Sequence, residues 1–171
     1  MSGYCDIAPG HPVHGPYHDE EYGFPQTDDA VLFERLSLEI MQAGLSWLIV
    51  LKKRAALRAA FEGFDPARVA LYGEAEVERM MGDAGIIRNR RKLIAIIENA
   101  KRLQGLGSPF AAWLSAQPVQ SKEDWVKLFK RTFVFVGGEV VGEFLMSIGT
   151  LPGAHRADCP IQAKIDHLRQ V

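Results

Sequence analysis

Apolar residues recur at intervals of three and four along most of this 171-residue chain, and this spacing constrains its fold more than any other feature. The period is that of α-helices with one apolar face. It predicts a helix that begins at the capping sequence Thr27-Asp28-Asp29 and ends near Gly44, and another from Ser46 toward Phe61. Further helices are predicted from Asp65-Pro66 and over 74–81, 90–103, 121–131 and 139–148. No strands alternate with these segments, so the predicted fold class is all-α.

Two stretches depart from the helical pattern. Residues 1–27 are rich in glycine and proline, which predicts an ordered or tethered loop rather than a regular element. Residues 133–136, Phe-Val-Phe-Val, are the one stretch that could pass for a strand, but a lone strand has no partner. We therefore interpret 133–136 as buried extended chain or the start of a helix.

The length suits one compact domain, or two small helical lobes sharing an interface, and we predict a single domain over residues 1–171. With 47% hydrophobic and 24% charged residues, the composition is that of a globular protein, and the longest apolar runs are too short to span a membrane. The first six residues lack the basic segment and apolar run of a secretory signal, so we expect a cytoplasmic protein with no membrane partner.

Overall charge does not indicate a nucleic-acid binder, because the net charge is -1 and the pI is about 6.5. Two local basic clusters could nevertheless face phosphates. They are Arg88, Arg90, Arg91 and Lys92, and Lys52, Lys53, Arg54 and Arg58. The alternative is that both clusters are ordinary solvated surface.

The two cysteines lie near opposite ends of the chain, each with a histidine. Cys5 and His18 are thirteen positions apart, and His155 and Cys159 are four apart. In a reducing compartment such cysteines are more plausible as metal ligands than as a disulfide. Two thiolates and two imidazoles are a set that structural zinc prefers, and four protein ligands leave no open coordination position for catalysis. The predicted zinc would be a clasp joining the two termini.

Two alternatives to this site stay open at the level of spacing. His11, His14 and His18 would share one face of a helix and form a rival site, although Pro12 and Pro16 argue against a helix there. The other alternative is a set of unrelated surface histidines and buried cysteines.

Residues 81–92 lie between two predicted helices and contain Gly85, which is available for a positive φ, followed by basic residues. A glycine hairpin between helices can present backbone N–H groups to a phosphate, and the start of the next helix adds a favourable dipole. Such a contact would read no base sequence. The alternative is a simple tight turn in a helical bundle.

Glu39 is the most informative carboxylate, since at about 100° per residue it lies only about 20° from Leu32, at the edge of the apolar face. A carboxylate there must find a hydrogen-bond partner, become protonated or bind a ligand, and the alternative is an ion pair with Arg35. Residues 42–47, Gln-Ala-Gly-Leu-Ser-Trp, follow directly and break the helix. An acid beside Trp47 suits a base-binding pocket, although the tryptophan could equally be a core anchor.

In combination, these residues resemble the DNA-3-methyladenine glycosylase I family, a divergent branch of the helix-hairpin-helix DNA glycosylases. The similarity covers nearly the whole chain and weakens only after about Leu103 and in the last ten residues. The matching motifs, in order, are Cys5, Tyr17-His18-Asp19-Glu20, Leu38-Glu39, Gln42 to Trp47, Leu51-Lys52-Lys53-Arg54, Asp83 to Arg88, Phe135-Val136-Gly137, and His155 with Cys159.

The resemblance implies an all-helical, helix-hairpin-helix fold and a monomer that repairs double-stranded DNA. The hairpin around Gly85, with Arg88 and Arg90, would grip the duplex, and Gly44-Leu45 would fill the gap that a flipped base leaves. The structural zinc ion would be held by Cys5, His18, His155 and Cys159.

The resemblance also implies base excision repair by hydrolysis of an N-glycosidic bond. Glu39 would be the catalytic residue and would hydrogen-bond the polar edge of 3-methyladenine, while Tyr17 and Trp47 would stack on its faces. Methylation makes this base cationic, so aromatic faces and one carboxylate would favour it over neutral adenine.

Several positions depart from the pattern of this family. Most helix-hairpin-helix relatives carry a catalytic Asp soon after the hairpin, whereas no Asp occurs here between Asp83 and Asp124, in agreement with this branch. The other departures are Ile7 and His14 in place of aromatics, and Gly138 and Glu139, followed by Glu143, in place of small hydroxyl residues. They leave two other functions open, a non-catalytic or altered-specificity DNA-binding module and a zinc-sensing or assembly protein.

Overall fold

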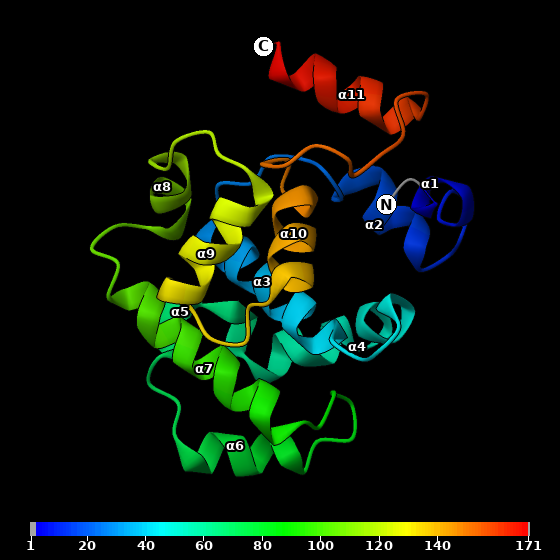
Figure 1. The fold of residues 1–171 in the computed structure, drawn as a ribbon. Coiled ribbons are helices and arrows are strands. Elements are labelled where there is room, and N and C mark those ends of the chain that lie inside the picture. The colour runs from blue at the N-terminus through cyan, green and yellow to red at the C-terminus, as the bar shows by residue number, and fades with distance from the viewer. Residues whose placement is uncertain (1–2, 171) are drawn as a thin grey trace. The chain divides into compact units, whose positions relative to one another are not determined.

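The computed structural model describes residues 3–170 and is built from helices joined by turns (Figure 1). No strand occurs within this range, which confirms the predicted all-α class. The helices are α1 (Tyr4–Ile7), α2 (His14–Glu20), α3 (Asp29–Gln42), α4 (Trp47–Ala60), the 3-10 helix η1 (Glu62–Phe64), α5 (Pro66–Val69), α6 (Glu74–Met81), α7 (Arg90–Gln104), α8 (Phe110–Ser115), α9 (Lys122–Thr132), α10 (Gly138–Ser147) and α11 (Pro160–Arg169).

The chain divides into two compact units. Unit 1 contains both ends of the chain, Met1–Pro25 and Gly142–Val171, and unit 2 is Gln26–Val141. The interpretation of residues 1–171 as one domain stays a prediction.

Unit 2 is organised around α3, which packs against α4, η1, α7 and α8 (Figure 1). The helix begins where predicted, because the Asp28 side chain accepts hydrogen bonds from the N–H groups of Ala30 and Val31. Ser46 caps α4 in the same way by accepting from the N–H of Ile49. Leu32, Phe33 and many other apolar side chains of α3 are fully buried, so this helix is the centre of the unit 2 core.

Unit 1 corrects the prediction for residues 1–27, which form helices α1 and α2 rather than only a loop. Pro16 lies in the first turn of α2, where a helix needs no backbone N–H donor, so proline is tolerated there. The proline argument against a helix at His14–His18 was therefore wrong. Helices α8 and α11 were also not predicted, although Pro160 at the first position of α11 is a typical start signal.

Residues 133–136 link α9 to α10 and form no strand. Phe133 is extended, whereas Phe135 has a φ of 60°, in the left-handed region that a bulky residue rarely adopts. Phe133 and Val136 are buried. The interpretation of this segment as buried extended chain therefore holds only in part, and the alternative of a helix start is wrong because α10 begins at Gly138.

Candidate functional site

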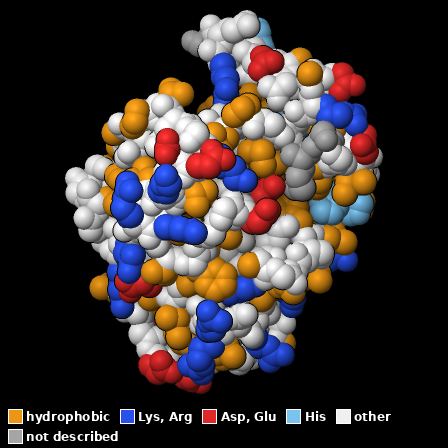
Figure 2. Space-filling model, viewed as in Figure 1, with side chains coloured by type: hydrophobic (Ala, Val, Ile, Leu, Met, Phe, Trp, Pro, Cys, Tyr) orange, Lys and Arg blue, Asp and Glu red, His pale blue; other side chains and the backbone are white. Residues whose placement is uncertain are grey.

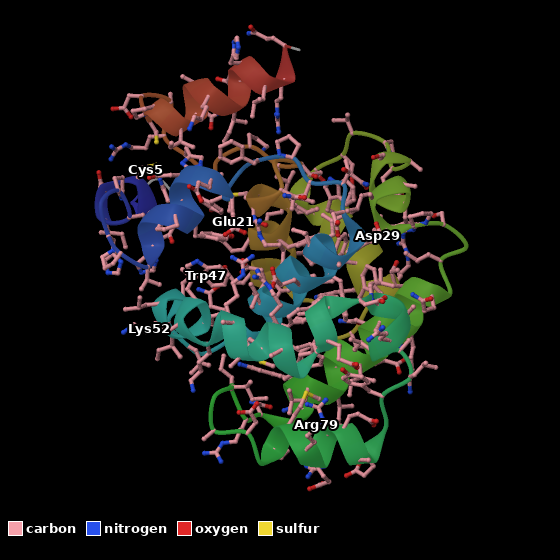
Figure 3. All side chains as sticks on the ribbon, turned by 180° about the vertical axis from the view of Figure 1, so that it is seen from behind. Cys5, Glu21, Asp29, Trp47, Lys52 and Arg79 are labelled. Carbon is pink, nitrogen blue, oxygen red and sulfur yellow. The ribbon has the colours of Figure 1, made fainter. Side chains whose placement is uncertain are left out.

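Four buried side chains in unit 1 bring their metal-binding atoms together. The Sγ atoms of Cys5 and Cys159 and one ring nitrogen each of His18 and His155 all lie within 4.8 Å of one another. Cys5 belongs to α1 and is labelled in Figure 3. The two ring nitrogens, His18 Nε2 and His155 Nδ1, are 3.1 Å apart, and each lies 3.4–3.8 Å from the two sulfur atoms.

These separations fit a tetrahedral metal site. Bonds of about 2.0–2.1 Å from zinc to nitrogen and about 2.3 Å to sulfur place ligand atoms roughly 3.3–3.8 Å apart. Outer hydrogen bonds also orient both rings, since His18 Nδ1 lies 2.7 Å from Asp19 Oδ1 and His155 Nε2 lies 2.5 Å from the Tyr22 carbonyl oxygen. Such partners on the second ring nitrogen are typical of metal-bound histidines.

The acid–base properties of the cluster suit a cation. Burial raises the pKa of the Cys5 thiol, so the thiolate needs a nearby positive charge to form. Burial also lowers the pKa of His155, which favours the neutral imidazole that binds metals. The rival set is not assembled, because Nδ1 of His11 accepts the N–H groups of Val13 and His14, and Nδ1 of His14 lies 2.7 Å from the Tyr4 hydroxyl.

Glu39 and Trp47 lie on either side of the break between α3 and α4, in unit 2. Glu39 is only 6% exposed and lies one turn before the end of α3. Trp47 is buried as the first residue of α4, at the end of that helix labelled in Figure 3. Glu39 and Trp47 thus place an acid and an aromatic ring on the two sides of the turn formed by residues 43–46.

The turn itself is exposed and carries an apolar side chain. Gly44 has a φ of 81°, a conformation that favours glycine, and nothing lies within 4 Å of a Cβ built there. Leu45 is 38% exposed, and its N–H donates to the Gln42 carbonyl. Ser46, where the sequence predicts the second helix to begin, is the N-cap of α4.

Lys92 fits neither interpretation of its basic cluster, phosphate-facing or solvated surface. The side chain is buried, and its Nζ donates to the carbonyl oxygens of Met41 (2.8 Å) and Ala43 (2.5 Å) at the end of α3. Burial lowers its pKa. Sequence could have given this signal, because Lys92 shares a helix face with Ile96 and Leu103, which are both buried.

The basic residues between Lys52 and Arg58 also differ in their partners. Glu34 of α3 binds Arg54 at 2.6 Å and Arg58 at 2.5 Å, so these two arginines join α4 to α3. Burial alone would raise the pKa of Glu34, but hydrogen bonds from Arg58 and Arg54 outweigh it and hold the pKa below its ordinary value. Lys52 is exposed on α4 (Figure 3), and Lys53 donates to the Ala84 carbonyl at 3.3 Å.

The turn between α6 and α7 differs from the predicted glycine hairpin at one point. Gly85 does not have a positive φ. Glycine is favoured there because an added Cβ would lie 3.2 Å from Ala56 Cβ and 3.1 Å from Asp83 Oδ1. Its N–H donates to Asp83 Oδ1 at 2.8 Å, so a phosphate would have to displace that carboxylate.

The two arginines of this turn differ in their partners. The guanidinium of Arg90 binds Glu74 at 2.9 Å and also Glu78. Arg88 is exposed and has no ion-pair partner among residues 3–170. Figure 2 shows Lys and Arg side chains gathered over α7 and α9, with acidic side chains at α6. Arg88 is therefore the better placed of the two to meet a phosphate.

Tyr17 and three of the departures lie in unit 1. Tyr17 is buried and stacks on Tyr22, with ring centroids 5.7 Å apart. The Tyr22 hydroxyl donates to Glu143 at 3.4 Å. Ile7 is 62% exposed, whereas His14 is buried against Tyr4.

The other two departures line an open hollow in unit 2. Its volume is about 630 Å³, and it is bordered by Ala43, Lys130 and residues 133–140, which include Gly138 and Glu139. Glu139 therefore adds a carboxylate to a hollow that begins at the turn between Glu39 and Trp47.

No helix among residues 3–170 combines the length and apolar character that crossing a membrane would require.

Comparison with known proteins gives a consistent result. The model of the methyladenine glycosylase family matches residues 8–123. The chain is 41% identical to DNA-3-methyladenine glycosylase 1 of Escherichia coli (strain K12), covering 91% of this chain and 94% of the relative. It is 35% identical to a DNA-3-methyladenine glycosylase of Haemophilus influenzae (strain ATCC 51907 / DSM 11121 / KW20 / Rd), covering 94% and 98%.

A solved structure of 3-methyladenine DNA glycosylase I from Staphylococcus aureus, described for its recognition of 3-methyladenine, superposes with a TM-score of 0.79. It is 32% identical and covers 93% of this chain and 96% of its own. The chain belongs to the methyladenine glycosylase family. It is accordingly a DNA N-glycosylase, as the resemblance in sequence implied.

Proposed function

We propose that the protein flips 3-methyladenine out of alkylated double-stranded DNA and excises it by hydrolysing the N-glycosidic bond, as a step of base excision repair. One observation carries this proposal beyond family membership. In unit 2, a buried carboxylate (Glu39) and a buried indole (Trp47) flank an exposed Gly44-Leu45 turn.

The chemistry of the base explains why this set of groups is sufficient. Methylation at the 3-position makes the purine cationic and its glycosidic bond weak, so the enzyme needs recognition and a water molecule more than a strong acid. The Glu39 carboxylate attracts a cation and accepts hydrogen bonds from the base, and the Trp47 ring offers a face to it. Tyr17, which belongs to unit 1, is predicted to stack on the base as well.

The exposed groups of unit 2 are proposed to bind the duplex. Leu45 is an apolar side chain on an exposed turn, which suits insertion into the space that the flipped nucleotide leaves. Arg88 is available for a backbone phosphate. Gly85 and Arg90 contribute only if phosphate displaces Asp83 from the former and Glu74 with Glu78 from the latter. These contacts would bind any duplex and lose affinity with salt, and a single copy of the chain is sufficient for them.

We further propose that Cys5, His18, His155 and Cys159 hold one Zn²⁺ ion. The donor set and spacing suit zinc, and four protein ligands give the ion a structural role. The ion would stabilise the fold by tying together the two segments that make up unit 1.

Base release from methylated DNA tests the activity. Glu39→Gln and Trp47→Ala should each lower the single-turnover rate of 3-methyladenine release by about tenfold or more, because each removes an interaction with the cationic base. Glu123→Gln, which alters an exposed carboxylate on α9, is the matched control and should release base normally. Rates unaffected by both changes would overturn the proposed pocket. DNA binding without base release by the wild type would instead select the non-catalytic module.

A further inference from the structure

Lys92 is a buried cation whose position the activity described so far does not explain. It lies in the first turn of α7, is 5% exposed, and donates to the carbonyl oxygens of Met41 and Ala43. These carbonyls belong to the last turn of α3, where a helix leaves acceptors without intrahelical donors. They immediately precede the exposed Gly44-Leu45 pair.

The ammonium group is held by carbonyl oxygens and not by a carboxylate. Among residues 3–170, no carboxylate oxygen lies within ion-pair distance of Lys92 Nζ. Burying an unpaired cation is costly, and a well-packed apolar side chain often gives equal or greater stability at such a position. Two donors from one rigid helix, however, fix the positions of two peptide groups on either side of Gln42. The arrangement therefore fixes the positions of the Met41 and Ala43 peptide groups more than it adds to the free energy of unfolding.

Lys92 connects two elements that are both proposed to take part in base excision. Helix α7 begins directly after the turn 82–89, which is proposed to bind DNA phosphate, and α3 ends at the turn between Glu39 and Trp47. A movement of α7 would be transmitted to the carbonyls of Met41 and Ala43 through hydrogen bonds of 2.8 and 2.5 Å.

We propose that Lys92 is a positioning residue for base excision: its two hydrogen bonds to the end of α3 hold the 43–46 turn in place relative to Glu39 and Trp47, and couple this turn to α7. The inference rests on the proposed function. It assigns Lys92 no contact with the base and no proton transfer.

The chain offers a matched control at the opposite end of α4. Arg79 of α6 donates to the carbonyl of Ala60, the last residue of α4, at 2.9 Å (Figure 3). Arg79→Met thus also removes a cation from the C-terminal end of a helix, although Arg79 is exposed and the Tyr72 hydroxyl also donates to the Ala60 carbonyl. At 1.5 Å per residue this end lies roughly 20 Å from Trp47 along α4, far enough to leave the turn undisturbed.

The test compares Lys92→Met, Lys92→Arg and Arg79→Met in the full chain. Lys92→Met should lower the single-turnover rate of 3-methyladenine release about ten- to hundredfold, because small misplacements of reacting groups have effects of that order. The Kd for undamaged duplex DNA should change less than about threefold, since no proposed phosphate contact is removed. Lys92→Arg keeps N–H donors and should recover most of the rate, and Arg79→Met should release base like the wild type.

Hydrogen exchange provides the readout that a purely structural role would not give. In Lys92→Met the amides of residues 41–47 should exchange faster, whereas those at the α4 C terminus should not, and Arg79→Met should show the reverse. Wild-type base release by Lys92→Met, or equal rate losses in Lys92→Met and Arg79→Met, would overturn the inference.

Two further comparisons distinguish a failure of the positioning role from a loss of folding and from a failure of the proposed function. If Lys92→Met does not fold, Lys92→Gln, which keeps a shorter N–H donor, should be slower than Lys92→Arg, and equal rates would count against the inference. If Glu39→Gln is impaired but Lys92→Met is not, the positioning role fails and the proposed function stands. If the wild type releases no base, the proposed function itself fails.

Discussion

The Cys2His2 cluster of unit 1, which is proposed to hold zinc, and the α3–α4 turn of unit 2 hold their important side chains in different ways. The cluster gathers four ligands from both ends of the chain and surrounds them with outer hydrogen bonds, so that no donor atom is left open. The turn leaves Leu45 exposed and is held by a helix cap and one buried cation. The difference is consistent with the proposed roles, a structural one for the cluster and a part in base excision for the turn.

The largest effect is expected from breaking the cluster. Cys159→Ser should lower the free energy of unfolding by about 3 kcal/mol or more, because metal binding adds directly to folding energy. For a chain of this size the Tm should fall by roughly 6–12 °C. Thermal melts with and without a chelator, together with metal analysis giving about one zinc per chain, check this prediction.

Two quantities should stay unchanged if the cluster has only a structural role: the rate of base release after the cluster is broken, and the stability of a variant outside the cluster. The folded fraction of Cys159→Ser should release 3-methyladenine at close to the normal rate. His167→Gln, which alters an exposed histidine of α11 outside the cluster, should leave both Tm and metal content unchanged. A metal-free wild type with the same stability would remove the structural role assigned to the cluster.

A smaller effect is expected from Glu34, which joins α3 to α4 without any metal. Glu34→Gln should cost about 2 kcal/mol at neutral pH, because it removes a buried carboxylate that accepts hydrogen bonds from Arg54 and Arg58. The matched control is Glu98→Gln, which breaks an exposed pair with Arg102 and should cost less than about 1 kcal/mol. Urea unfolding at several pH values measures both.

The pH dependence of the Glu34 effect follows from its lowered pKa. The pair is fully stabilising above the pKa of about 4.5 that Glu has in the unfolded chain, and it is lost as pH falls through the lower pKa of the folded state. The wild type and Glu34→Gln should therefore converge in stability under acid conditions. A gap between them that stays constant from neutral to acid pH would contradict the ion pair.

The same two regions show what the sequence could predict. The four members of the Cys2His2 cluster were identifiable because two cysteines and their histidine partners are chemically distinctive, whatever the structure between them. The limits of α3 and α4 were identifiable because Asp28 and Ser46 cap their own helices through local hydrogen bonds. The first prediction depends on rare residue types, and the second depends on interactions within a few residues of the chain.

Partners distant in sequence were not predictable in this way. Lys92 stands beside three arginines, so it was grouped with them as phosphate-facing or solvated surface, whereas its acceptors lie 49 and 51 residues away in α3 and the turn. Arg90 is predicted to bind DNA, and its ion pairs with Glu74 and Glu78 of α6 could not be foreseen from the sequence. Gly85 was given a positive φ, whereas its proximity to Ala56 of α4 favours glycine. At each of these three positions, contacts with residues distant in sequence determine the environment of the residue.

The smallest expected effect concerns the far end of α4, which is again held without a metal. The hydroxyl of Tyr72 donates to Glu62 at 2.6 Å and to the Ala60 carbonyl at 3.3 Å, and burial together with Glu62 raises the pKa of Tyr72 to about 12. Tyr72→Phe should cost about 1 kcal/mol at neutral pH, the usual value of one hydrogen bond. Equilibrium unfolding of the two proteins measures this difference.

Alkaline pH then separates Tyr72 from the metal cluster. The stabilisation by Tyr72 is complete below its unfolded-chain pKa of about 10 and is lost as pH rises through about 12, so the wild type should converge on Tyr72→Phe over that window. A metal ion held by the cluster would be bound through thiolates and neutral imidazoles, which alkaline pH does not protonate, so its binding is not expected to weaken over that window. Tyrosinate absorbance should lose one high-pKa component in Tyr72→Phe, and ionisation of Tyr72 near its ordinary pKa would contradict the proposed hydrogen bonds at this end of α4.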